Sequence, residues 1–129
     1  MKTHDQMRHQ LKILRVYELE PDMEGYRILV DRLWPRGLCK EALVPFVWAK
    51  NIAPTNELRK WFGHDPERYE EFTQKYQKEL NNNPHAEKFV KDIENVLEDQ
   101  DVILLYAAKN KEINQAIVLK KWLEERLKR

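Results

Sequence analysis

The run DVILLYAA, residues 101–108, constrains the fold of this chain more than any other segment. Its apolar residues are continuous rather than alternating, which is typical of a strand buried on both faces, as in a parallel sheet. Two further runs of large apolar residues, LKILRVYEL (11–19) and YRILVDRLW (26–34), also predict strands. Pro35 cannot donate to a sheet ladder, so the second strand is expected to end before it. The sequence therefore predicts a small, mainly parallel sheet.

Helix signals fill the rest of the chain. Thr55 suits an N-cap, and Gly63 suits the left-handed position that ends the same helix. Asp65 and Pro66 fit the cap and first turn of a second helix, which continues to Leu80. Apolar periodicity predicts two more helices, over residues 86–97 and from the loop KNKE to the C-terminus, and leaves 35–46 as an irregular loop with one helical turn.

Strands mixed with helices predict an α/β fold: a small, mainly parallel sheet in a three-layer, Rossmann-like single domain. We expect residues 1–10 to form a flexible N-terminal arm and residues 11–129 to form the domain. A chain of 129 residues suits one domain.

Composition excludes several classes of protein. The net charge is +1, so nothing draws the whole chain towards nucleic acid, and any anion site has to be local. The lone Cys39 excludes a disulfide and a cysteine metal site, and the histidines lack metal-ligand spacing. Three glycines cannot build a glycine-rich phosphate loop, so we expect no metal and no cofactor. Without an apolar membrane span or signal core, a cytoplasmic protein is expected.

Polar side chains follow two of the predicted strands, where ligands bind in open parallel sheets. DRLWPRG follows the second strand and AAKNKEINQ follows the run 101–108, so parallel strands would bring both segments to one edge. Arg32 and Arg36 would offer planar donors to a carboxylate or phosphate, and the last helix would add free amide hydrogens. For Arg32, an ion pair with Asp31 is supported as well as a ligand contact; the loop position of Arg36 favours a ligand.

His64 lies in the short joint between two predicted helices, in the stretch WFGHDP. Its ordinary pKa suits proton transfer, but the spacing alone favours a structural role in the joint. Asp65 is explained by helix capping without any catalysis.

The runs YRILVDRLWPRGL, APTNELRKWFGHDPERYEEFTQKYQKEL and ILLYAAKNKEINQAIVL resemble the YeaO-like branch of the domain-of-unknown-function family 488. The resemblance covers roughly residues 13 to 125 and implies a small cytoplasmic α/β protein, with no activity attached. It implies that the motif includes the following residues: Arg32, Trp34, Pro35, Arg36, Arg59, His64, Asp65 and Tyr106. Two positions depart from the pattern: Ile113 stands where the family often has histidine, and Cys39 where it commonly has serine, which argues against thiol chemistry.

Three hypotheses remain open at this level. The first is an enzyme acting on a phosphate-bearing small molecule, a nucleotide or nucleoside derivative, without a metal. Its candidate catalytic residues are His64, Asp65 and Tyr106, and its candidate anion and substrate contacts are Arg32, Trp34, Arg36, Arg59, Lys109 and Asn114. The second is a non-catalytic binding module for an anionic metabolite, nucleic acid or protein partner. In the third, these motifs are turns that define the fold and have no ligand. No motif in the sequence indicates the reaction, the substrate or whether the protein is a monomer or a homodimer.

Overall fold

Four parallel strands form the sheet of this computed structural model, which describes residues 9–127. They are Leu11–Arg15 (β1), Tyr26–Leu29 (β2), Val47–Trp48 (β3) and Val102–Tyr106 (β4), arranged in the order β1-β4-β2-β3. All five residues of β4 are buried, so the strand predicted from the continuous apolar run is confirmed. The strand order differs from that of dinucleotide-binding folds, in keeping with the missing glycine-rich loop.

The strands are shorter than the sequence predicts, and one was missed. β1 ends at Arg15, where the chain enters a 3-10 turn, and β2 ends at Leu29 rather than at residue 34. Apolar residues beyond these points pack against a face of the sheet instead of extending its strands. The apolar sequence pattern therefore continues past the end of each strand. β3 lies directly after the segment 35–46 that was expected to be irregular, and its two residues are held by their register with Ile28 and Leu29. The helical turn expected there is present at Lys40–Ala42.

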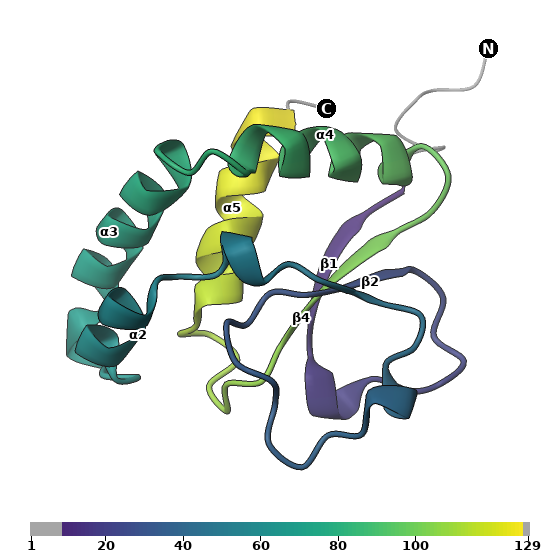
Figure 1. Ribbon diagram of the computed structural model, residues 1–129, viewed down its shortest axis with the longest axis horizontal. Helices are drawn as coiled ribbons and strands as arrows, with labels where there is room; N and C mark the ends of the chain where they lie inside the picture. Colours follow the sequence, from purple (N-terminus) through teal and green to yellow (C-terminus); the bar gives the residue numbers. More distant parts are fainter. Residues whose placement is uncertain (1–8, 128–129) are drawn as a thin grey trace.

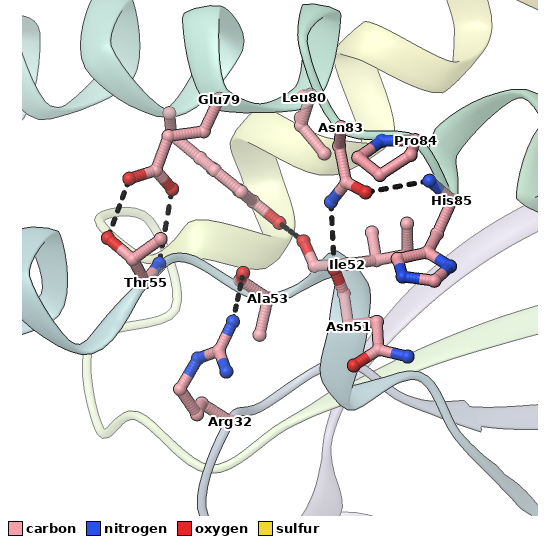
Figure 2. A pocket seen from close by; sticks show the side chains of 11 residues that line it. Arg32, Asn51, Ile52, Ala53, Thr55, Glu79, Leu80, Asn83, Pro84 and His85 are labelled. Carbon is pink, nitrogen blue, oxygen red and sulfur yellow. Dashed lines mark hydrogen bonds between the residues drawn. The ribbon is translucent and has the colours of Figure 1, made fainter.

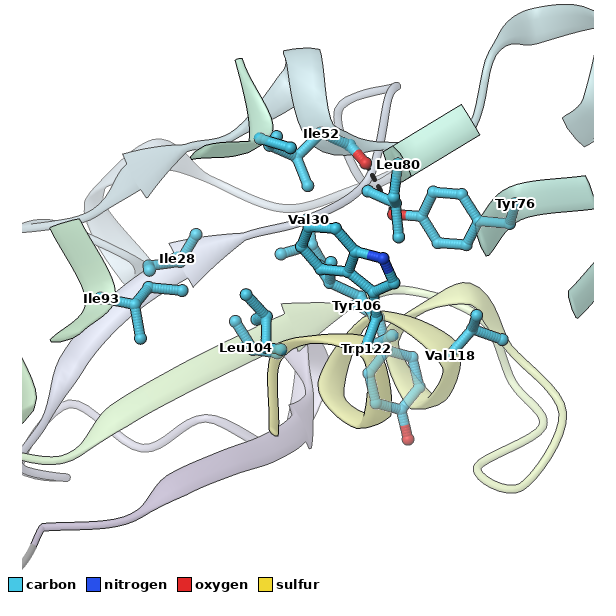
Figure 3. Packing of buried hydrophobic residues seen from close by; sticks show 14 of the residues in the cluster. Ile28, Val30, Ile52, Tyr76, Leu80, Ile93, Leu104, Tyr106, Val118 and Trp122 are labelled. Carbon is cyan, nitrogen blue, oxygen red and sulfur yellow. Dashed lines mark hydrogen bonds between the residues drawn. The ribbon is translucent and has the colours of Figure 1, made fainter. Parts of the chain in front are cut away.

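Four helices cover one face of the sheet (Figure 1). They are Asn56–Phe62 (α2), Tyr69–Asn81 (α3), Ala86–Leu97 (α4) and Gln115–Leu127 (α5). Alternate residues of β2 and β4 meet this layer, and Figure 3 shows part of the resulting core: Ile28, Val30, Ile52, Tyr76, Leu80, Ile93, Leu104, Tyr106, Val118 and Trp122.

The predicted helix caps are confirmed. The Thr55 hydroxyl accepts a hydrogen bond from the backbone N–H of Leu58 at 3.2 Å, and α2 ends at Gly63, whose φ is 53°. The Asp65 carboxylate accepts from the N–H of Glu67 at 3.0 Å and opens a 3-10 turn that leads into α3. The two helices are therefore joined by a short, fully capped link.

The opposite face of the sheet is covered by loops and 3-10 turns rather than by helices. Residues 16–25 and 31–46 supply this layer, which packs on the side chains of Leu29, Ile103 and Leu105. Trp34, Phe46 and Trp48 form its aromatic part, with ring centroids 5.5 to 5.8 Å from Trp34. The third layer of the fold is thus irregular backbone, which needs partners for its carbonyl oxygens.

Arg27 on β2 supplies those partners. Its side chain is only 6% exposed and lies on the loop-covered face. Its two terminal nitrogens donate at 3.0 to 3.5 Å to backbone carbonyl oxygens of both loops, those of Glu20, Pro21, Met23, Leu43 and Val44. One buried cation therefore binds the two loops to each other and to the sheet. Of the N-terminal arm, residues 1–8 lie outside the described residues; Gln10 donates from its N–H to the Asp101 carboxylate at 2.7 Å.

We predict that Arg27→Met lowers the free energy of unfolding by about 3 kcal/mol or more, since it leaves one buried and several partly buried carbonyl oxygens without a donor. Urea denaturation measures the loss. Arg36→Met is the matched control, because that side chain is exposed, and it should change stability by no more than about 0.5 kcal/mol. A loss below about 1 kcal/mol for Arg27→Met would contradict its role as the link between the loops.

Candidate functional site

The carboxyl ends of β2 and β4 lie next to each other, as the sequence predicted. After β2 the chain passes to the loop-covered face, whereas after β4 it leads to α5 on the helical face. In open α/β sheets, a crevice forms where neighbouring strands send their connections to opposite faces, and ligands bind there. The segments 31–36 and 107–114 therefore meet at the edge of the sheet where open α/β folds bind their ligands.

Asp31 links the two segments at this edge. One carboxylate oxygen accepts from the N–H of Ala107 at 3.0 Å, the other accepts from the side-chain amide of Gln115, and the Asp31 carbonyl accepts from the Trp48 indole at 2.7 Å. Burial raises the pKa of Asp31 from its usual value of 3.8 to about 6, and the hydrogen bonds from Ala107 and Gln115 only partly offset it. The Asp31 carboxylate thus accepts hydrogen bonds from groups at the edge where a ligand was expected to bind.

The three candidate catalytic residues have separate structural environments. His64 is exposed, has a φ of 60°, and places its ring centroid 6.0 Å from that of Phe62. A positive φ is uncommon outside glycine, so the joint holds His64 in a strained backbone conformation. Asp65 caps the following turn and lies 3.7 Å from the side chain of Arg68. Tyr106 is 3% exposed, and burial raises its pKa, which keeps the hydroxyl protonated and so unable to accept a proton as a phenolate.

Two of the candidate contact residues use their side-chain polar groups in hydrogen bonds within the protein. The Trp34 indole donates to the Leu38 carbonyl at 2.8 Å, and its ring packs in the aromatic cluster of the loop layer. Asn114 is 1% exposed; its amide oxygen accepts from the N–H of Ile117 at 3.0 Å and its amide nitrogen donates to the Asn110 carbonyl at 2.9 Å. Asn114 is therefore the N-cap of α5, and it occupies the helix terminus that was expected to bind an anion.

Three other candidate contacts are basic. Arg36 and Lys109 are exposed, and neither side chain makes a hydrogen bond or ion pair within residues 9–127. Arg59 is half-buried: one terminal nitrogen donates to the Asn56 side chain at 3.3 Å, while its Nε is buried without a partner in the described part of the chain. A ligand role for these three residues stays a prediction.

Arg32 is the candidate residue that lines a cavity. Its Nε donates to the Pro54 carbonyl at 2.7 Å, and one terminal nitrogen donates to the Ala53 carbonyl at 3.2 Å, a bond that Figure 2 shows. The two bonds together fix the plane of the guanidinium. The ion pair with Asp31 that the sequence left open does not form. The other terminal nitrogen, Nη1, has no hydrogen-bond partner in the described part of the chain. The cavity has a volume of about 330 Å³.

The polar groups of the cavity come from three further segments. Asn51 precedes α2, Glu79 is on α3, and His85 stands just before α4 (Figure 2). Both carboxylate oxygens of Glu79 accept hydrogen bonds from Thr55, at 3.1 Å from its N–H and 2.6 Å from its hydroxyl. The Asn83 side chain joins two walls, because it donates to the Asn51 carbonyl and accepts from the His85 N–H, both at 2.8 Å. Ile52, Leu80 and Pro84 supply an apolar wall.

Sequence reasoning missed most of these residues. Asn51 and Glu79 belong to no recognisable motif, and they meet only because α3 packs back against the segment before α2. His85 lacks the spacing of a metal ligand, so no sequence pattern was a reason to place it in a site. Asp31 was considered only as a neighbour of Arg32, although its position directly beyond a strand was a usable signal.

Metal and membrane features are absent from residues 9–127. No group of three or more His, Cys, Asp or Glu side chains there is placed to hold a metal ion. None of the helices in that range combines the length and the apolar character needed to cross a bilayer.

The sequence has relatives among uncharacterised proteins. Residues 10–129 match a family described as the inactive DUF488-N3 subclade. Uncharacterized protein YeaO of Escherichia coli strain K12 is 44% identical over 109 residues, which are 84% of this chain and 92% of that protein. Uncharacterized protein Rv3073c of Mycobacterium tuberculosis strain H37Rv is 47% identical over 72 residues, 55% of this chain, and the matched stretch spans only 60% of its length. No solved structure matches.

We predict that Asp31→Asn stabilises the protein at neutral pH. The folded-state pKa lies above the usual value, so the wild-type free energy of unfolding falls as pH rises from about 4 to about 6, by up to about 3 kcal/mol. Asparagine mimics the protonated acid and avoids this loss. Urea denaturation should give a gain of about 1 to 3 kcal/mol at pH 7.5 that disappears near pH 4. Destabilisation by Asp31→Asn at pH 7.5 would contradict the prediction, because it would mean that the folded protein stabilises the ionised carboxylate more than a neutral side chain.

Proposed function

Because the chain belongs to the inactive DUF488-N3 subclade, we propose that it is a non-catalytic binding module for a small anionic molecule. The proposed ligand enters the cavity lined by Arg32 and places a carboxylate or phosphate group against the guanidinium. Asn51 and His85 supply further hydrogen-bond donors from the cavity wall.

The observation that carries this proposal is the state of the Arg32 guanidinium. Two carbonyl oxygens fix its plane, but carbonyls do not neutralise its charge, and no carboxylate within residues 9–127 forms an ion pair with it. A cation that is already oriented and has a free Nη1 loses little entropy when it binds an anion. Arg32 is half-buried and faces the cavity with a charge that no carboxylate in the described residues offsets, which favours an anionic ligand there.

Two features favour binding over catalysis. An enzyme acting on a phosphate-bearing small molecule would need a positioned acid or base near the bound group. His64 is exposed at the joint, Asp65 serves as a cap, and Tyr106 lies in the core, so none of them lines the Arg32 cavity. The family description as inactive points the same way. The enzyme hypothesis stays a prediction, and the near-neutral net charge favours a small ligand over nucleic acid.

We predict that inorganic phosphate or acetate raises the melting temperature of the wild type more than that of Asn51→Asp. The substitution adds a negative charge to the cavity at a side chain without hydrogen bonds in the described residues, and it should weaken anion binding by about tenfold or more. Differential scanning fluorimetry over an anion series measures the shift.

The matched control is Asn95→Asp, which adds the same charge on an exposed position of α4 outside the cavity. It also controls for phosphate's general stabilising effect on folded proteins, which every variant shares. Equal shifts for the wild type and both variants would mean that the anion acts on the whole protein rather than at Arg32, and the proposal would then fail.

A further inference from the structure

The Arg32 cavity contains an uncompensated negative charge as well as a positive one. Glu79 lines the same cavity, is half-buried, and forms no ion pair within residues 9–127. Its partner Thr55 is neutral and donates one hydrogen bond to each carboxylate oxygen. Each oxygen has a second lone pair, so Glu79 keeps the capacity to accept hydrogen bonds from a ligand.

From this arrangement we infer that the ligand is a zwitterion of the α-amino acid class, with its carboxylate at Arg32 and its ammonium group at Glu79. This inference rests on the proposed function and narrows its ligand. Arg32 and Glu79 do not pair with each other, although both face one small cavity. A ligand that carries both charges satisfies both groups, whereas a phosphate dianion is attracted by Arg32 but repelled by Glu79 and therefore binds more weakly.

The size and the walls of the cavity agree with a small metabolite. A volume of about 330 Å³ lies at the low end of the range for ligand pockets. Ile52, Leu80 and Pro84 form the apolar part of the wall and would contact an aliphatic side chain. Asn51 and His85 add hydrogen-bond donors to the wall, so the lining includes a cation, a carboxylate and apolar side chains, one kind of group for each part of an amino acid.

The test uses the chain of 129 residues and the standard L-α-amino acids, added one at a time and followed by isothermal titration calorimetry. For each amino acid that binds, the carboxylic acid with the same skeleton but no amino group is measured beside it, together with inorganic phosphate. We expect at least one amino acid to bind about tenfold or more tightly than its deaminated analogue and than phosphate. This comparison needs no variant, so it stands even if a substitution prevents folding.

Glu79→Gln then tests the ammonium contact. Glutamine keeps the shape, its oxygen can accept from the Thr55 N–H, and its amide can donate to the Thr55 hydroxyl. This variant should bind the amino acid no more tightly than the deaminated analogue, whereas Asn51→Asp should weaken both. Glu94→Gln, on an exposed position of α4, removes the same charge away from the cavity and should leave the preference intact.

The outcomes separate this inference from the proposed function. Binding of phosphate or simple carboxylates without any preference for amino acids would overturn the inference and leave the anion site standing. An amino acid whose preference survives Glu79→Gln would also overturn it. No binding of any anion or amino acid, in calorimetry or in melting temperature, would overturn both proposals.

Discussion

Hydrogen bonds from arginine to backbone carbonyl oxygens are the interaction on which the rest of this structure depends. Only one face of the sheet is covered by helices, so the other layer is irregular backbone with carbonyl groups that no helix or strand satisfies. Arg27 takes up five of these carbonyls while it remains almost fully buried. Arg15, at the end of β1, does the same for the loop after β4, with its Nε donating to the Ala108 carbonyl at 3.0 Å.

The same interaction defines the candidate site. Two nitrogens of Arg32 donate hydrogen bonds to carbonyls of the segment before α2. These bonds position the segment and orient the guanidinium. What is left is one free nitrogen and a full positive charge on the wall of a small cavity. At the neighbouring edge of the sheet, Asp31 and Asn114 occupy the groups that an anion would otherwise have bound. The protein's own side chains thus use two of the groups expected to bind an anion at this edge, and the Arg32 cavity lies beside it.

Patterns of local chemistry made much of the fold predictable. The continuous run of β4, the Thr55 cap, the Gly63 terminus and the Asp-Pro start of the next turn are all determined by neighbouring residues, and all were predicted. β3 was not, because a two-residue strand depends on its partner β2 rather than on its own sequence. The cavity itself was not predicted: Arg32 is the one lining residue that was a candidate contact, since Asn51, Glu79 and His85 are brought together by helix packing. An arginine after a strand also has the same sequence context whether its side chain binds a ligand or a backbone carbonyl, so the sequence alone does not distinguish the two roles.

The central claim is that Arg32 is an oriented cation at a ligand cavity, and NMR of the arginine side chains tests it most directly. With ¹⁵N labelling, the Nε–H of Arg32 should exchange slowly with water because it is bonded to the Pro54 carbonyl, whereas the exposed Arg36 Nε–H should exchange fast. On titration with acetate, the Arg32 signal should shift together with the backbone amides of Asn51, Thr55 and His85. Fast exchange at Arg32, or shifts that centre on Arg36 and Lys109 instead, would contradict the account.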